Sequence, residues 1–277
     1  MLSPASDAKL RETCSRNDFN QRDSSHMTKP EYPHVLLVKV HEPLTGTWEK
    51  DRVILEKAAQ QPTLANEYYN LAAAIMGLFQ QFTYGTPSQP NYPQRIGLLR
   101  KVYDELYPIG HFANLYFTRP ENVVVQWVEG NQQHDAIVEY KAEGSNQSDI
   151  SYLEITTLQD QEDADELKEL SKSPSVTTVT TNSAQKKHGR KIERLKKVLE
   201  KKAGINYPAQ TALLVYTDED RFRQYSFGLA APEIDKKADY EAVLREFEPS
   251  LQKFSHVFIF SKHEIYCAWS PAPKVAE

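Results

Sequence analysis

Residues 122–157 read "NVVVQWVEGNQQHDAIVEYKAEGSNQSDISYLEITT". Three runs rich in β-branched and aromatic residues are separated by a short turn and by a loop of Gly, Ser and Asn. Such runs are typical of strands, and such separators are typical of turns. Three strands at this spacing predict an antiparallel meander.

The third run, "SYLEITT", carries a glutamate in the middle of a strand. Because side chains alternate faces along a strand, Leu153 and Ile155 point one way while Glu154 and Thr156 point the other. One explanation is a glutamate exposed to solvent. The other is a carboxylate held there for chemistry, and the rest of the chain bears on the choice.

Further elements are expected on both sides of the meander. Before it, the patterns predict a strand at 34–41, a helix at 63–82 capped by Thr63, and a helix at 93–107 that ends before Pro108. After it, they predict a basic helix, a strand buried on both faces, an amphipathic helix and a final strand or hairpin, at 184–204, 211–220, 240–254 and 256–269.

This order predicts an α/β (α+β) fold with a mixed central β-sheet flanked by helices. Residues 1–31 are polar and aperiodic, so we expect a disordered or accessory arm there. Residues 32–92 would form a strand and helix that pack on a core domain of residues 93–277.

Composition narrows the function. The 277 residues are 40% hydrophobic and carry a net charge of −5, so any nucleic-acid surface must be local. The two cysteines, Cys14 and Cys267, match no disulfide or zinc framework. The chain shows neither a signal peptide nor a stretch of transmembrane length, so we expect a cytoplasmic protein with no membrane partner.

Asp135 and Glu154 are the two acids that stand out in strand runs. If their strands are neighbours, the two carboxylates can converge at one edge of the sheet. Mg²⁺ prefers oxygen ligands, commonly one or two carboxylates completed by water and phosphate. Such an ion can generate a hydroxide nucleophile and stabilise the charge that develops in phosphodiester cleavage.

Asp135 followed by "YLEIT", with a helix before and a helix and strand after, resembles the PD-(D/E)xK, or restriction-endonuclease-like, superfamily. The resemblance covers roughly residues 94–218. It implies a restriction-endonuclease-like core and a nuclease that uses Mg²⁺ or Mn²⁺. By position, it implies Asp135, Glu154 and the backbone carbonyl of Ile155 as metal ligands.

The superfamily's lysine position is occupied by Thr156, whose hydroxyl cannot supply a positive charge. The basic helix offers replacements. Extending its apolar stripe toward the N-terminus brings up His188 and Gln185, with Lys191 on the flank. We expect these three to face the sheet near Glu154, where His188 could act as a general acid or base or be an ordinary half-buried histidine. Glu105 lies off the stripe of its own helix and is left out.

The other faces of the basic helix are rich in lysine and arginine. They form either a phosphate-binding surface or a solvated helix face. On the first reading, the contacts to nucleic acid come from Lys186, Lys187, Arg190, Arg194 and Lys197.

Three functions remain open. The first is a metal-dependent nuclease acting on DNA more than on RNA. The second keeps the fold but has lost catalysis with the lysine, and binds nucleic acid or a protein partner. The third is an unrelated α/β protein in which Glu154 is a surface residue. The sequence locates no interface for a homodimer, although the superfamily contains many dimers.

Overall fold

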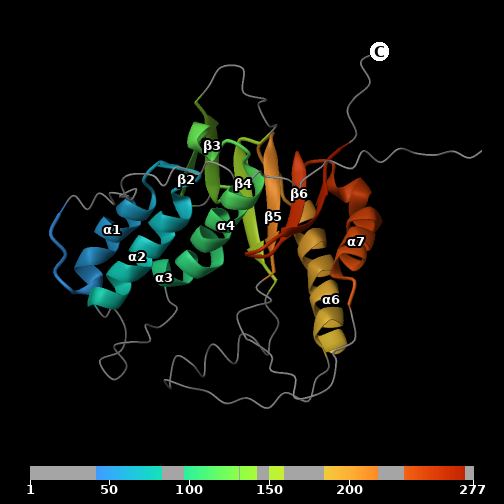
Figure 1. Ribbon diagram of the computed structural model, residues 1–277, viewed down its shortest axis with the longest axis horizontal. Coiled ribbons are helices and arrows are strands. Elements are labelled where there is room, and N and C mark those ends of the chain that lie inside the picture. The colour runs from blue at the N-terminus through green and yellow to red at the C-terminus, as the bar shows by residue number, and fades with distance from the viewer. Residues whose placement is uncertain are drawn as a thin grey trace, which may run out of the picture. The chain divides into compact units, whose positions relative to one another are not determined.

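A seven-stranded mixed sheet forms the centre of the computed structural model (Figure 1). The structure describes residues 42–82, 97–130, 132–141, 150–158, 184–217 and 234–271. The strands lie in chain order: β1 (Thr63–Leu64), β2 (Val123–Trp127), β3 (Ala136–Tyr140), β4 (Tyr152–Thr157), β5 (Thr211–Tyr216), β6 (His256–Phe260) and β7 (Ile265–Trp269). The strand predicted at 34–41 lies outside the described residues.

The pairing changes direction at β4. Strands β1 to β4 pair antiparallel, which confirms the predicted meander. Strands β4, β5 and β6 then pair parallel, and β7 returns antiparallel to β6. Each parallel step needs a crossover helix, and these are α6 (Ala184–Ala203) and α7 (Lys236–Leu251). The sheet is therefore mixed and flanked by helices, as the sequence predicts.

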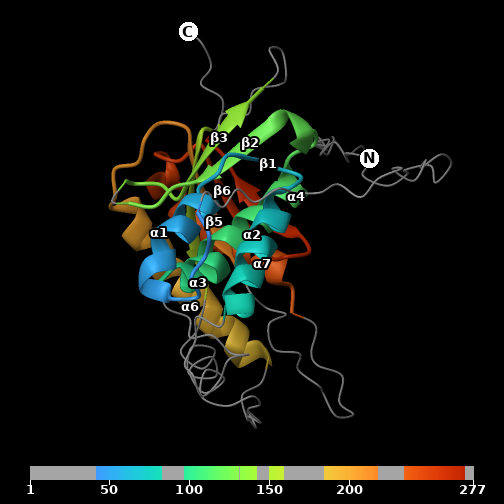
Figure 2. The ribbon, with the colours of Figure 1, turned by 90° about the vertical axis from the view of Figure 1, so that its left-hand side faces the viewer.

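Helices cover both faces of the sheet (Figure 2). On one face, α1 (Trp48–Ala59), α2 (Tyr68–Phe82), α3 (Gly97–Lys101) and α4 (Tyr107–Tyr116) pack with the inner side chains of β2 to β6. On the other face, α6 and α7 pack on the opposite side chains of β5 and β6. Every residue of β5 is buried because its alternate side chains enter the two cores.

The N-terminal elements differ from the prediction. Helix α1 was not predicted, and its start is fixed by the buried Asp51, which accepts hydrogen bonds from the backbone N–H groups of Thr45 and Gly46. Thr63 begins strand β1 instead of capping a helix, because Thr63 and Leu64 pair with Val125 and Val124 of β2. Helix α2 starts only at Tyr68. These elements share the sheet and the core of residues 93–277, and all described residues belong to one compact unit, Leu36–Glu277.

The predicted end of a helix before Pro108 is wrong. Helices α3 and α4 are joined by a π-helical turn, η1 (Val102–Leu106), and the helix runs on to Tyr116. Pro108 has no N–H to donate to the carbonyl of Asp104, four residues earlier. That carbonyl accepts a hydrogen bond from Thr157 Oγ1 at 3.2 Å, which ties the helix to the end of β4.

Candidate active site and cationic cleft

Asp135 forms hydrogen bonds with the two residues of β4 that flank Glu154, Leu153 and Ile155. Its N–H donates to the carbonyl of Leu153 at 2.7 Å, and its Oδ2 accepts from the N–H of Ile155 at 2.7 Å. The pairing of β3 with β4 ends at Ala136 and Leu153. The N–H of Ile155, beyond that pairing, is therefore bonded by the side chain of Asp135. The N–H and carbonyl of one strand residue point the same way, so the Ile155 carbonyl is directed to this side as well.

Glu154 is buried, with 8% of its surface exposed, and its partners come from the α6 side of the sheet. Lys202 Nζ, in the last turn of α6, forms an ion pair with Glu154 Oε1. The hydroxyl of Tyr207 donates to the same oxygen at 3.4 Å. The explanation of Glu154 as a solvent-exposed residue is therefore wrong.

Asp135 is surrounded by other carboxylates. Burial, followed by the nearby carboxylates of Glu154 and Glu105, raises the pKa of Asp135 to about 7. The Ile155 N–H and the Lys202 ammonium act in the opposite direction but do not offset burial. A carboxyl group whose pKa is raised to neutrality by burial and other carboxylates is typical of functional sites.

Glu105 is a third carboxylate near this pair. It accepts a hydrogen bond from Trp127 Nε1 at 2.7 Å, and burial raises its pKa. Lys101, four residues earlier, forms an ion pair with Glu129 at 2.6 Å and lies 5.5 Å from the centre of the Trp127 ring. Glu105 was left out on the basis of a regular helical wheel. The π turn changes the phase of the helix and turns this residue toward the sheet.

The donors fit a hard cation by their chemistry. In the described ranges, no group of three or more His, Cys, Asp or Glu side chains is placed to hold a metal ion. Two carboxylates, Asp135 and Glu154, with the carbonyl of Ile155, match the way proteins hold Mg²⁺, which keeps several waters. These three donors are all oxygens, whereas zinc sites are usually built from histidine and cysteine.

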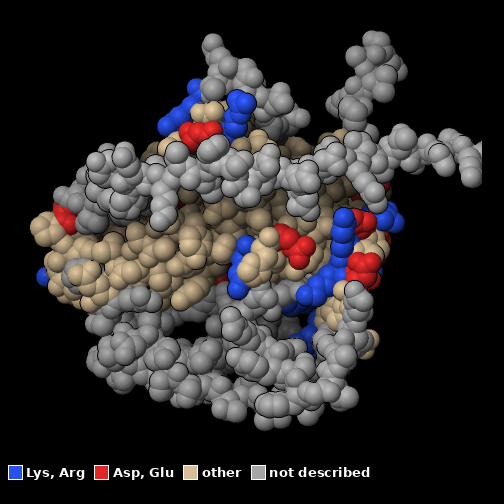
Figure 3. All heavy atoms as spheres, viewed as in Figure 1, with Lys and Arg blue, Asp and Glu red and all other residues tan. Residues whose placement is uncertain are grey.

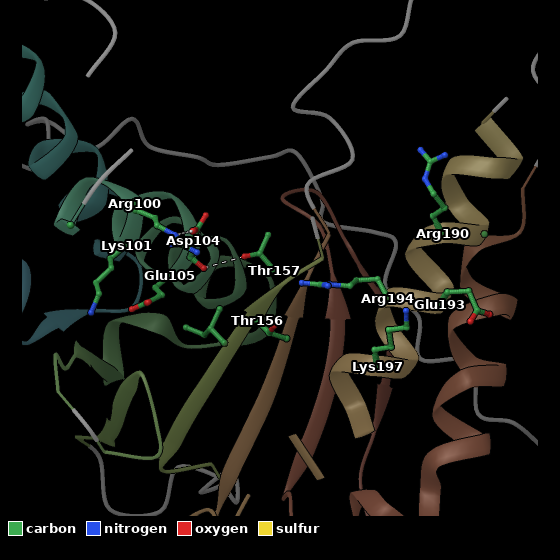
Figure 4. A pocket seen from close by; sticks show the side chains of 13 residues that line it. Arg100, Lys101, Asp104, Glu105, Thr156, Thr157, Arg190, Glu193, Arg194 and Lys197 are labelled. Carbon is green, nitrogen blue, oxygen red and sulfur yellow. Dashed lines mark hydrogen bonds and ion pairs between the residues drawn. The ribbon is translucent and has the colours of Figure 1, made fainter. Parts of the chain in front are cut away.

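A cationic cleft of about 990 Å³ lies at the carboxyl end of β4, and neither Asp135 nor Glu154 is among the residues that line it (Figure 4). Glu105 and the Ile155–Thr157 segment line it, which connects it to the site. Its five cationic side chains come from two walls, α3 and α6: Arg100, Lys101, Arg190, Arg194 and Lys197. Lys and Arg side chains also gather on the α6 side of the surface in Figure 3.

Three of the predicted phosphate contacts, Arg190, Arg194 and Lys197, line this cleft. Lys186 and Lys187 lie on α6 outside the lining. Arg100 and Lys101 were missed, since they belong to a helix with no run of charge. Thr156 lines the cleft, half-buried, and Arg194 extends toward it from α6 (Figure 4).

Of the three residues expected to assist Glu154, His188 and Gln185 lie on the α7 side of α6. His188 Nε2 bonds Asp239 Oδ2 of α7 at 2.9 Å, and its ring packs against Tyr240. Gln185 is exposed and, with His188, lines a groove of about 570 Å³ between α6 and α7. Lys191 is half-buried on the flank of α6. His188 is buried as expected, but its partner is Asp239 of α7. The contact between α6 and Glu154 is made at the other end of the helix, by Lys202.

Comparison with protein-family models, with curated proteins and with solved structures finds no match to this chain. None of the helices in the described part of the chain is both long and apolar enough to cross a membrane.

Proposed function

We propose that this chain is a divalent-metal-dependent, nuclease-like protein that hydrolyses phosphodiester bonds of nucleic acid, with DNA as the first substrate to test. One observation carries the proposal: the Lys202 ammonium bonds the buried Glu154 beside Asp135, and the next three residues of the same strand, Ile155–Thr157, line a cationic cleft. A carboxylate pair, a lysine and a phosphate-binding surface are the parts that such chemistry needs.

The order of elements supports a restriction-endonuclease-like core. Helix α4, the antiparallel strands β2 to β4, helix α6 and the parallel strand β5 follow one another in the order that the resemblance implies. Asp135 directly precedes the second strand of this unit and Glu154 lies in the third, close to where the superfamily has its acids.

Each residue has a role in the proposed site. Asp135 and Glu154, with the Ile155 carbonyl, would hold Mg²⁺ or Mn²⁺, which when bound lowers the pKa of water and stabilises charge on the phosphate. Lys202 supplies the positive charge that Thr156 lacks. The cleft's cations hold the phosphate backbone, and Tyr207 orients the Glu154 carboxylate through its hydrogen bond.

A second function, binding nucleic acid without hydrolysis, is favoured by the same ion pair. Lys202 already neutralises Glu154, and within the described residues no group of three or more His, Cys, Asp or Glu side chains is placed to hold a metal ion. In that case the Lys202 ammonium takes the place of the metal ion beside Glu154, and the cationic cleft binds nucleic acid without cleaving it.

Cleavage of labelled single- and double-stranded DNA, with Mg²⁺ or Mn²⁺ and with EDTA, tests the proposal. We expect cleavage by the wild type with metal, and losses of roughly a hundredfold or more for Glu154→Gln and Lys202→Met. Lys201→Met is the matched control, because Lys201 is the exposed neighbour of Lys202. Calorimetry on the same variants measures metal binding. We expect Lys201→Met to bind the metal like the wild type and Glu154→Gln to have lost binding.

A rescue variant makes the test sharper. If Lys202 takes the place of the motif lysine, then Lys202→Met combined with Thr156→Lys should regain part of the lost activity. Binding of DNA without metal-dependent cleavage by the wild type would reject the nuclease and leave the binding function.

A further inference from the structure

A row of aromatic side chains starts on the helix that forms one wall of the cationic cleft. We define the aromatic row as Tyr103, Tyr107, Tyr69, His111 and Tyr216. Consecutive ring centres are 6.0 Å apart for Tyr103 and Tyr107, 5.4 Å for Tyr107 and Tyr69, and 5.1 Å for Tyr69 and His111. His111 then stacks on Tyr216 at 6.0 Å, with the two rings 8° from parallel.

Strand pairing and a shared helix connect the row to the cleft. Tyr216, the last residue of β5, is the parallel neighbour of Thr157, which lines the cleft. Tyr103 and Tyr107 belong to the same continuous helix as Arg100 and Asp104 of the cleft wall. The row therefore begins at the wall that carries two of the five cations.

The row lies at the edge of the core, where Tyr216 is buried and Tyr103 and Tyr107 pack against the core, but most of its rings are only partly covered. Tyr69 is 37% exposed, and Tyr103, Tyr107 and His111 are half-buried, whereas Phe112 on the same helix is fully buried. Burial, then Lys262 and His263, lowers the pKa of His111 to about 4, so its ring is neutral at physiological pH. The accessible ring surface therefore belongs to Tyr69, Tyr103, Tyr107 and His111, since Tyr216 is buried.

We propose that the cleft and the aromatic row together bind a single-stranded nucleic acid, with phosphates along the cleft and bases against Tyr107 and Tyr69. Proteins that hold single strands combine a positive groove with aromatic rings on which bases stack. A duplex already stacks its bases on each other, so it can use the cations but not the rings. The inference rests on the proposed function and assigns its substrate class.

The size of the cleft agrees with this assignment. About 990 Å³ is at the upper end of the range for small-ligand sites, which suits a few nucleotides of one strand. Its cations stand on two walls, α3 and α6, so they can flank one backbone from both sides.

Fluorescence anisotropy in EDTA tests the inference without cleavage. The probes are a labelled single strand, the same strand in a blunt duplex, and an abasic strand of equal length. We expect the wild type to bind the single strand roughly tenfold or more tightly than either other probe, since each stacked base is worth about fivefold to a hundredfold. Equal affinity for the single and abasic strands would overturn the inference with no variant needed.

The variants Tyr107→Ala and Tyr69→Ala should each weaken single-strand binding by roughly fivefold or more and leave abasic-strand binding unchanged. Tyr107→Phe keeps the ring and should retain affinity. Leu115→Ala, at an exposed apolar residue of α4, is the matched control. If one alanine variant fails to fold, the other variant and the wild-type comparison with the abasic strand still test whether bases stack on the rings.

The two proposals fail separately. Single-strand preference without metal-dependent cleavage would reject the nuclease but keep this inference. Cleavage with equal affinity for single strand and duplex would reject this inference but keep the nuclease.

Discussion

Helix α6 has two sides that differ in charge, although its sequence suggests one uniformly basic helix. On the β4 side, the cationic cleft has five cationic and three acidic side chains. On the α7 side, the groove has one lysine, Lys196, against four carboxylates. Gly189 and Glu193 line both. A run of charge in sequence therefore says little about local potential, because neighbouring elements decide which charges are neutralised.

The side-chain pairs on the two sides of α6 differ in burial as well. Lys202 and Glu154 expose only 18% and 11% of their side chains, whereas Asp239, which bonds His188, exposes 53%. A buried pair is expensive to break, since the remaining charge is left without its partner, and an exposed pair is screened by solvent. The following predictions test this difference.

The largest expected effect is on stability at the buried pair. Lys202→Met should lower the free energy of unfolding by about 3 kcal/mol, because Glu154 remains buried without its cation. Asp239→Asn, on the other side of α6, should lower it by less than about 1 kcal/mol. Urea denaturation of both variants at pH 7 measures this. Equal effects would show that the difference in burial does not set how much each pair stabilises the fold.

The second expected effect is pH-dependent. The pKa of Asp135 is raised from 3.8 to about 7 in the folded protein, so the unfolded chain loses its proton first. Stability from this group is present at low pH and is lost as pH rises from about 4 to about 7. Relative to Asp135→Asn, the wild type should lose on the order of 2 kcal/mol between pH 5 and pH 8 in EDTA.

Asp239→Asn serves as the control for this measurement, since its carboxylate is largely exposed. Urea denaturation across the pH range should give parallel curves for the wild type and Asp239→Asn. A wild type that becomes more stable than Asp135→Asn as pH rises would contradict the expected sign.

A third, smaller effect concerns polyanion binding. Arg194→Gln, in the cationic cleft, should weaken single-strand binding by about tenfold at low salt and reduce the slope of log K against log salt by about 1. Lys196→Gln removes an equal charge from the groove, where Lys196 pairs with Glu246 at 2.8 Å, and should have little effect. Titrations at several salt concentrations would separate the two, and equal losses would mean that only net charge matters.

Sequence patterns predicted the sheet better than the helices around it. Strands β2 to β6 lie in short runs bounded by turn residues, and the run at β5 is apolar on both faces. Helix α1 has a weak pattern, because Ala58 and Ala59 form half of its buried residues and Val53 is 55% exposed. The end expected before Pro108 depended on regular helical bonding, which the π turn of η1 replaces.

Two residues of the candidate site were missed for different reasons. The stripe through Leu195 and Leu199 continues to Lys202 at helical spacing, so Lys202 could have been found by extending it toward the C-terminus as well as toward His188. Glu105 could not, since nothing in the sequence marks the π turn that reorients it. Contacts between helices, such as that of His188 with Asp239, depend on the packing of α6 on α7 and are not encoded in either helix alone.

The smallest expected effect is at Gly189, which lies between the two sides of α6. A Cβ at this position would meet nothing within 4 Å outside the backbone of its own helix, so Gly189→Ala fits the folded state. Because glycine is a poor helix former, the substitution should raise the free energy of unfolding by about 0.5–1 kcal/mol. Single-strand affinity, measured on the same samples, decides what the glycine does for the cleft. Unchanged affinity would mean that the single-stranded nucleic acid contacts the side chains of Arg190 and Arg194. A loss of affinity would mean that the sugar-phosphate backbone approaches α6 at Gly189 itself.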